Sequence, residues 1–310
     1  MKVHESVLGV GVLVAVFAGC ASASEAPLAV EAEASLEPIS SSFAGYVSVR
    51  RDTRECSIPM CGGYFVHELN RSLADRYVPA LDLTALGLGP TSERALRDAP
   101  DDELVLRGRL GSADPRSGMR ALVVTEAYHG MPGVKVTKGD VFYAMAPRDP
   151  QVECFAVPCP NEVARPINGS TTRVFDTLRV DRAAWPHVDR DWLAARALSH
   201  GGLVAGTFAP PDDSHADRKL VLDASQVFVR LPDRAGPCAT GTSAACDSGE
   251  VMTFRRTPDR CMVPTGCVKP GICALLIPAC GAGYVRVSWR ADSGGCNAFA
   301  CDPAFLSDSR

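Results

Sequence analysis

The residues of this chain that could do chemistry are mainly its thirteen cysteines, and four of these lie in two matching pairs. Cys56 and Cys61 lie in ECSIPMCGGYFVHELNRS, residues 55–72, and Cys154 and Cys159 lie in ECFAVPCPNEVARPINGS, 98 residues later. Each pair encloses four residues, one of them a proline, and a short bent loop can bring two β-carbons to the ~3.8 Å that a disulfide needs. Redox pairs have closer spacing, and zinc sites add a second pair or histidines. We therefore expect a structural disulfide in each pair.

Most of the other cysteines are concentrated near the C-terminus. Such a density is typical of a small domain held by about four disulfides rather than by a large core. Eight cysteines allow 105 pairings, and the sequence does not choose among them. The eight are Cys238, Cys246, Cys261, Cys267, Cys273, Cys280, Cys296 and Cys301.

The histidines and the other catalytic residue types form no recognisable motif. None of the six histidines lies in an HExxH pattern or at metal spacing from a second ligand, and no G-x-S-x-G elbow, phosphate loop or dinucleotide fingerprint is present. His67, in the first Cys-x4-Cys stretch, corresponds to Arg165 in the second, which argues against a duplicated catalytic role. The acidic loop 212–217 offers oxygens for calcium, but a solvated turn is the simpler interpretation. We predict no metal and no cofactor.

The overall charge argues against nucleic acid as a partner. The 310 residues include 32 Lys and Arg against 36 Asp and Glu, and only 6% of residues are aromatic. No basic tract is long enough to follow a phosphate backbone, and few rings are available to stack on bases.

The N-terminus has the features of an export signal. Residues 1–19 contain Lys2, then an apolar run that is too short to span a membrane, then small residues before Cys20. This ending resembles a bacterial lipobox, in which Cys20 would carry the lipid, although Phe17 replaces the usual Leu. The alternative is an ordinary signal cut elsewhere, with Cys20 lost or free.

If Cys20 is lipidated, twelve cysteines remain, an even number that suits disulfides. Ala21 after the lipobox cysteine favours the outer membrane in the general sorting pattern of lipoproteins. Residues 20–43, rich in Ala, Glu, Ser and Pro, are predicted to be a disordered tether. The expected location is therefore the cell envelope, with the protein exported and lipid-anchored.

The two Cys-x4-Cys stretches begin a longer internal repeat. Matches such as Leu106-Arg107-Gly108 with Val204-Ala205-Gly206, and Leu122-Val123-Val124 with Leu220-Val221-Leu222, keep a spacing of 97 or 98 residues. We predict a signal peptide over 1–19, the tether over 20–43, module copies over 44–135 and 136–232, and a Cys-rich C-terminal domain over 233–310.

Each copy is predicted to be mainly β, with three strands, one short helix and two further strands. The predicted elements of copy 1 are strands 46–49, 63–69 and 77–83, a helix over 92–98, and a hairpin of 104–110 with 121–127. In copy 2 a helix begins after Asp189, and the hairpin joins 203–208 to 220–228. This order fits an OB-like module or small β-barrel, and equally a small antiparallel sheet with one covering helix. In an OB-fold, the ligand face is that of strands 2 and 3 with the loops after strands 1 and 4, here the Cys-x4-Cys loops and 111–119 or 209–217.

An asparagine ends each Cys-x4-Cys stretch. Asn70-Arg71-Ser72 and Asn168-Gly169-Ser170 both satisfy the glycosylation sequon. We expect instead that each asparagine ends the second strand of its copy and hydrogen-bonds the local turn backbone.

The string RRDTRECSIPMCGGYFVHELN, residues 50–70, resembles an uncharacterised domain family found in secreted proteins and lipoproteins of myxobacteria. The segments CGAGYVRVSW and CNAFACDPAF near the C-terminus resemble Cys-rich ends of the same proteins. The resemblance covers most of residues 44–305. It implies location and architecture but no activity.

These features favour a disulfide-stabilised, non-catalytic envelope protein that binds a protein or polysaccharide. One alternative is a secreted hydrolase whose site comes together only in the fold, and a deep pocket with a His and an acid beside a Ser would favour it. Another is a protease inhibitor, which exposed convex Cys-bounded loops would favour. A shallow concave strand face would favour the binding protein.

Overall fold

The computed structural model describes residues 43–55, 61–147, 162–199, 201–209, 220–233, 238, 245–273 and 277–309. The chain divides into two units, Met1–Glu33 and Ala34–Arg310, and all described residues belong to the second. The predictions for the signal peptide, Cys20, the tether, Cys56, Cys154, Cys159 and loop 212–217 therefore fall outside the described residues. Within the described part, no helix is long and apolar enough to cross a membrane.

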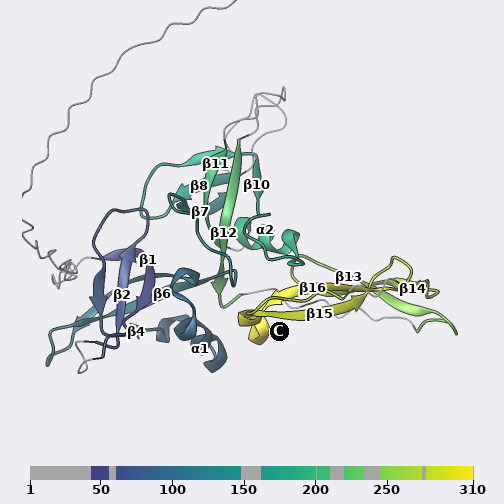
Figure 1. Cartoon of the computed structure of the whole chain (residues 1–310), viewed down its shortest axis with the longest axis horizontal. Helices are drawn as coiled ribbons and strands as arrows, with labels where there is room; N and C mark the ends of the chain where they lie inside the picture. The colour runs from purple at the N-terminus through teal and green to yellow at the C-terminus, as the bar shows by residue number, and fades with distance from the viewer. Residues whose placement is uncertain are drawn as a thin grey trace, which may run out of the picture. The chain divides into compact units, whose positions relative to one another are not determined.

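The two copies have the same order of six strands and one α-helix, and copy 1 contains two 3-10 helices in addition; many of these elements are labelled in Figure 1. Copy 1 contains β1 (Ala44–Arg51), β2 (Tyr64–Glu68), β3 (Arg76–Val78), β4 (Leu81–Asp82), η1 (Thr84–Leu86), α1 (Pro90–Asp98), η2 (Asp101–Glu103), β5 (Leu104–Ala113) and β6 (Arg120–Gly130). Copy 2 contains β7 (Val141–Pro147), β8 (Glu162–Pro166), β9 (Arg173–Phe175), β10 (Thr177–Arg179), α2 (Arg190–Leu198), β11 (Leu203–Ala209) and β12 (Val221–Leu231). The mainly β prediction is confirmed, but the predicted third strand is two short strands in each copy.

Local sequence patterns account for most of these elements. In β1, Val47 and Val49 are buried while their neighbours point to the other face, as the alternation of a strand requires. Helix α2 begins after Asp189, whose side chain accepts a hydrogen bond from the Trp192 backbone N–H at 3.0 Å. Helix α1 instead has Pro90 in its first turn, a position where no backbone N–H is needed.

The strands of both copies form one 12-stranded sheet, and no closed barrel is found among the described strands. The strand order is β3-β2-β1-β5-β6-β12-β11-β7-β8-β9, with β4 parallel to β6 and β10 parallel to β12. β6 and β12 pair from Ala127↔Leu231 to Gly130↔Phe228, so the two copies share one sheet. Each final strand thus hydrogen-bonds to its counterpart in the other copy, which makes the sheet continuous.

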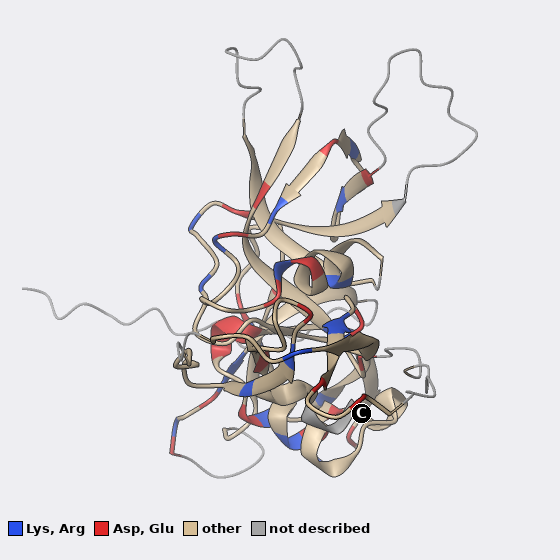
Figure 2. Ribbon diagram, turned by 90° about the vertical axis from the view of Figure 1, so that its right-hand side faces the viewer, with Lys and Arg blue, Asp and Glu red and all other residues tan. Residues whose placement is uncertain are grey.

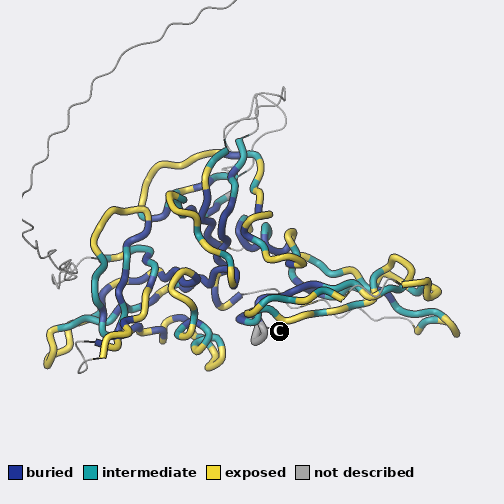
Figure 3. Tube along the Cα trace, in the orientation of Figure 1, coloured by how far each residue is buried: buried dark blue, intermediate teal, exposed yellow. Residues whose placement is uncertain are grey.

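The sheet has a hydrophobic cluster on each face. The larger cluster includes Leu106 of β5, Leu193 of α2, Val227 of β12 and Leu306 of the C-terminal region. The smaller cluster lies between the copies and includes Val105 and Phe228. Figure 3 shows buried segments concentrated along the sheet, while the C-terminal hairpins are mostly intermediate or exposed. The core is therefore shared by both copies rather than divided between them.

The C-terminal region consists of two β-hairpins, each with two disulfides. The first hairpin pairs β13 (Val251–Arg256) with β14 (Met262–Val268), and the second pairs β15 (Tyr284–Arg290) with β16 (Asn297–Pro303) before η3 (Ala304–Ser309). The disulfides are Cys238–Cys261 and Cys246–Cys267 in the first, and Cys273–Cys296 and Cys280–Cys301 in the second. Sequence separations of 23 and 21 residues occur in both hairpins, so the region is itself a tandem repeat of one hairpin unit.

Candidate ligand-binding cleft

The feature of the described structure that best fits a ligand is a cleft of about 420 Å³ against the outer face of β1 and β2. Ligand pockets commonly enclose about 300–1,000 Å³. Its apolar wall includes Val105 of β5, Phe142 of β7 and Phe228 of β12, which belong to or pack against the cluster between the copies. Both copies therefore contribute to one cleft, together with Lys135 and Val136 of the segment that joins them.

Register places Ser48, His67 and Asp75 together in this cleft. Ser48 of β1 lies directly opposite His67 of β2 in the antiparallel ladder, so both side chains point to the same face of the sheet. Asp75 precedes β3, and its Oδ1 lies 3.1 Å from Nδ1 of His67. No side-chain hydrogen bond joins Ser48 to His67 in the described structure. All three residues line the cleft.

Charged groups of both signs surround these three residues. Arg50 lies over the Phe65 ring at 4.6 Å, and its Nη2 is 3.5 Å from Asp75. Asp101 accepts a hydrogen bond from the Arg51 backbone N–H at 3.1 Å. Lys135 lines the cleft without an ion-pair partner among the described residues. The cleft thus combines an apolar wall with polar and charged groups that can orient a ligand.

The two asparagines of the repeated stretches lie beside the cleft and join the copies reciprocally. Nδ2 of Asn70 donates to Phe142 O at 2.8 Å and Ile167 O at 2.9 Å, and Asn70 Oδ1 accepts from Phe142 N at 2.9 Å. Nδ2 of Asn168 donates to Tyr46 O at 2.7 Å and Leu69 O at 2.9 Å, and its Oδ1 accepts from Tyr46 N at 2.9 Å. The prediction that each asparagine hydrogen-bonds its local turn is wrong, because each amide binds only backbone of the opposite copy.

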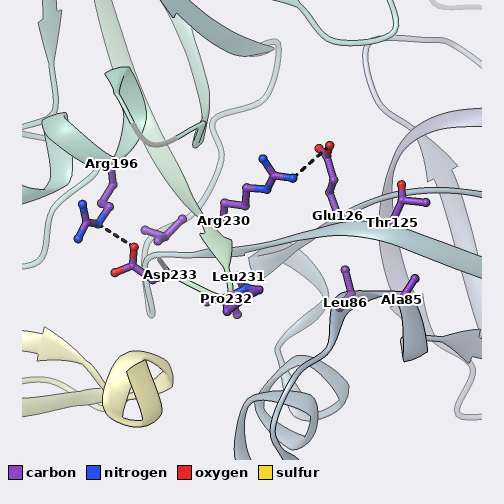
Figure 4. A pocket seen from close by; sticks show the side chains of 10 residues that line it. Ala85, Leu86, Thr125, Glu126, Arg196, Arg230, Leu231, Pro232 and Asp233 are labelled. Carbon is purple, nitrogen blue, oxygen red and sulfur yellow. Dashed lines mark ion pairs between the residues drawn. The ribbon is translucent and has the colours of Figure 1, made fainter. Parts of the chain in front are cut away.

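A smaller cavity of about 220 Å³ lies at the other side of the junction between β6 and β12 (Figure 4). Its charged groups are paired with one another. Arg230 lies 3.4 Å from Glu126, and buried Arg196 lies 2.9 Å from buried Asp233. Asp233 also pairs with Arg260 of the first hairpin at 3.3 Å. We interpret this cluster as the attachment of the C-terminal region to the sheet.

The second hairpin and η3 contact the end of β6 and the segment that follows it. The Tyr284 hydroxyl donates to Pro132 O at 3.0 Å, and Phe305 stacks on His129 with ring centroids 4.0 Å apart. Burial lowers the pKa of His129 to about 4. Burial also raises the pKa of Glu103, whose Oε1 accepts from Gly133 N at 2.7 Å. Both groups stabilise the fold in their neutral or hydrogen-bonded state rather than face a ligand.

The structure confirms some of the residues predicted from the sequence and adds others that the sequence did not indicate. Cys61 is buried and disulfide-bonded, and the eight C-terminal cysteines form four disulfides. Ser48 and Asp75 were missed, because no local pattern connects two polar residues on different strands. The hairpin pairing had an available signal, since the C-terminal cysteines recur at spacings of 34 or 35 residues.

Among the described residues, no group of three or more His, Cys, Asp or Glu could hold a metal ion. Basic and acidic residues are interspersed along the described ribbon (Figure 2). The chemistry of the cleft therefore depends on individual side chains.

A family model described as a domain of unknown function, DUF6748, matches residues 45–234, which is more than half of the chain. The chain belongs to this family. The matched DUF6748 residues span both copies, which agrees with one continuous sheet. The eight C-terminal cysteines lie outside the match.

An uncharacterized protein of Dictyostelium discoideum is 29% identical over 274 residues, covering 84% of this chain and 88% of that protein. Because this match is longer than the DUF6748 region, the similarity extends beyond it. The resemblance to a family of unknown function is thus confirmed, while the myxobacterial and lipoprotein part of that resemblance stays a prediction. No solved structure matches the chain.

Proposed function

We propose that this protein binds an amphipathic ligand in the cleft between its two copies and is held at the bacterial cell envelope by a lipid on Cys20. The observation that carries the binding role is the apolar wall of the cleft, to which β5, β7 and β12 all contribute. A cavity of this size with an apolar wall and a few convergent polar groups is the usual form of a ligand site.

The strand pairing within each copy supports an OB-like fold in which the barrel is open. The third strand of copy 1 is divided into β3, which pairs with β2, and β4, which runs parallel to β6. Strand β1 pairs with both β2 and β5. Copy 2 repeats this arrangement through β10 and β12. The cleft uses the outer face of β1 and β2, close to the face on which OB-folds bind ligands.

An amphipathic small molecule or an apolar side chain of a protein fits this cleft better than a polysaccharide. The aromatic residues that line it are Phe65, Phe142 and Phe228. Phenylalanine lacks the hydroxyl or N–H with which Tyr and Trp bind polar ligands at the edge of a ring. A ligand with an apolar body and one polar or charged end would satisfy both the wall and the charged groups.

Binding can be tested with the fluorescent probe anilinonaphthalene sulfonate, which has an aromatic body and one negative charge. We expect saturable fluorescence enhancement by the folded protein, and its loss in Val136→Glu, which puts a carboxylate into the cleft. Leu73→Glu is the matched control, since Leu73 is exposed and does not line the cleft. Equal probe binding by both variants would contradict the proposal.

The envelope location is tested separately. The lipobox-like ending and the tether-like composition of residues 20–43 support it. Attached acyl chains contribute about 0.8 kcal/mol per buried methylene to membrane binding. We expect Cys20→Ala to release the protein from membrane fractions of the expressing bacterium. A Cys20→Ala protein that still sediments with membranes would contradict lipid anchoring.

A hydrolase is the second candidate, because the cleft contains the combination of a His and an acid beside a Ser.

The protease-inhibitor alternative depends on the Cys-bounded loops, and residues 56–60 and 148–161 lie outside the described residues.

A further inference from the structure

We propose that Ser48, His67 and Asp75 form a nucleophile, a general base and a positioning acid that hydrolyse a carboxylic ester bound in the cleft. The inference rests on the proposed binding role and adds a reaction to it. None of the three residues belongs to a recognisable sequence motif. The juxtaposition arises because β1, β2 and the start of β3 are neighbours in the sheet.

The contact between His67 and Asp75 sets the orientation of the imidazole. Asp75 Oδ1 lies 3.1 Å from His67 Nδ1, so a proton on Nδ1 is held by the carboxylate and Nε2 is left free to accept one. Asp75 lies on the β3 side of β2, and Ser48 lies on the β1 side. Since the two ring nitrogens point in nearly opposite directions, Nε2 is directed to the side of the strand that carries Ser48.

Ser48 lies on the neighbouring strand directly opposite His67. Residues directly opposite each other in an antiparallel pair have β-carbons about 4.5–5.5 Å apart. Ser48 Oγ makes no hydrogen bond to His67 in the described structure. Catalytic hydrogen bonds often form only when the substrate is bound.

The reaction requires no partner other than the ester and water. Ser48 Oγ attacks the ester carbonyl carbon while His67 Nε2 accepts the hydroxyl proton, which gives a tetrahedral oxyanion. The carbon–oxygen bond to the alcohol then breaks, and His67 returns the proton to the departing alcohol oxygen. Water gives a proton to His67 and attacks the acyl-Ser48 carbonyl. The bond between that carbon and Oγ then breaks, His67 returns the proton to Ser48 Oγ, and the acid leaves. Arg50 and Lys135 supply positive charge in the cleft that can stabilise the oxyanion.

The walls of the cleft indicate the substrate class. Val105, Phe142 and Phe228 suit an aliphatic or aromatic acyl group, and a volume of about 420 Å³ limits its length. The His67 and Asp75 side chains are each 40% exposed, so water reaches the site for the second half of the reaction. We therefore infer an ester of a short or medium-length acyl group.

The second copy cannot carry the same reaction. Arg165 stands where copy 1 has His67, and its cross-strand neighbour is Ala144 where copy 1 has Ser48. Arginine stays protonated and cannot act as a general base at neutral pH. The proposal therefore predicts one active serine per chain, although the module is duplicated.

Two measurements test the reaction. The first treats the folded wild-type protein with a fluorophosphonate probe and maps the modified peptide by mass spectrometry, with Ser48 as the expected single site. The second follows hydrolysis of p-nitrophenyl butyrate. We expect Ser48→Ala and His67→Gln to abolish turnover, and Asp75→Asn to lower kcat by a factor of about 10³–10⁴ with little change in KM. Ser72→Ala, outside the cleft, should keep full activity.

The outcomes separate this inference from the binding role. Modification of Ser48 in the wild type supports the reaction even if a variant fails to fold. If anilinonaphthalene sulfonate binds in the cleft but Ser48 is neither modified nor required for turnover, the reaction is refuted and the binding role remains. If the probe does not bind in the cleft either, both proposals are refuted.

Discussion

The reciprocal asparagine contacts give the most direct test of how the two copies are joined. Asn168 makes three hydrogen bonds to copy 1, two to the carbonyls of Tyr46 and Leu69 and one from the Tyr46 N–H. Its backbone is left-handed, with φ of 56°, a conformation that asparagine and glycine tolerate better than other residues. Replacing Asn168 can therefore remove the hydrogen bonds alone or add backbone strain.

The size of the effect follows from these contacts. Each hydrogen bond contributes about 1 kcal/mol net, so Asn168→Gly, which keeps the backbone conformation accessible, should lower the free energy of unfolding by about 3 kcal/mol. Asn168→Ala should cost about 1–2 kcal/mol more, because a β-carbon is unfavourable in the left-handed region. Asn70→Gly should match Asn168→Gly, since Asn70 has φ of 58° and makes the reciprocal three bonds.

The measurement is urea unfolding at neutral pH, followed by circular dichroism and by hydrogen exchange at the Tyr46 amide. Ser170→Ala is the matched control, because it destroys the sequon Asn168-Gly169-Ser170 without removing any of the three bonds. We expect this control to remain within about 0.5 kcal/mol of the wild type, as is typical of surface substitutions.

Two results would refute the reasoning. One is an Asn168→Gly protein as stable as the wild type, which would show that the bonds between the copies contribute nothing. The other is an equal loss in Ser170→Ala, which would point to the sequon or to local loop structure instead.

Three further predictions concern the C-terminal region and its attachment. The pKa of His129 is about 4 in the folded protein and about 6.5 in the unfolded chain, so the unfolded chain takes up the proton first as the pH falls. The free energy of unfolding should therefore fall by up to about 3 kcal/mol between pH 6.5 and pH 4. A His129→Phe protein with the same pH dependence in thermal melts would disprove this. Arg196→Met removes one of the two ion pairs of buried Asp233 and should lower the free energy of unfolding by about 3 kcal/mol, measured in urea. An Arg196→Met protein as stable as the wild type would contradict the buried pair. Replacing Cys273 and Cys296 by Ser should destabilise the second hairpin by about 3 kcal/mol. Limited proteolysis should then cut the second hairpin before it cuts the sheet. Cutting of the hairpin and the sheet at the same rate would argue against separate hairpin units.

Several parts of the fold could be predicted because their signals are local. Alternation of buried and exposed residues identified β1, and Asp189 identified the start of α2. The predicted hairpins of both copies agree with β5–β6 and β11–β12 to within a few residues. The density of cysteines correctly indicated a region held by disulfides.

The closed-barrel alternative was wrong for a reason that no local pattern contains. The alternating sequence of a strand such as β6 or β12 is the same whether that strand closes a barrel, lies at the edge of a sheet or pairs with its counterpart in the other copy. Their pairing depends on how the two copies pack through the cluster that contains Val105 and Phe228. Sequence reasoning applied to one copy at a time could not reveal that contact.

The sequence by itself determined the mainly β composition, the internal repeat and the disulfide-rich end, while the export signal at the N-terminus stays a prediction. Each of these depends on neighbouring residues or on a spacing along the chain. Only the tertiary structure decided which cysteines pair, that Asn70 and Asn168 join opposite copies, and that Ser48, His67 and Asp75 share a cleft with Phe142 and Phe228. Those contacts join separate strands, and the contacts of the asparagines and the phenylalanines also join separate copies. Which strands meet depends on the burial of apolar surface across the whole sheet.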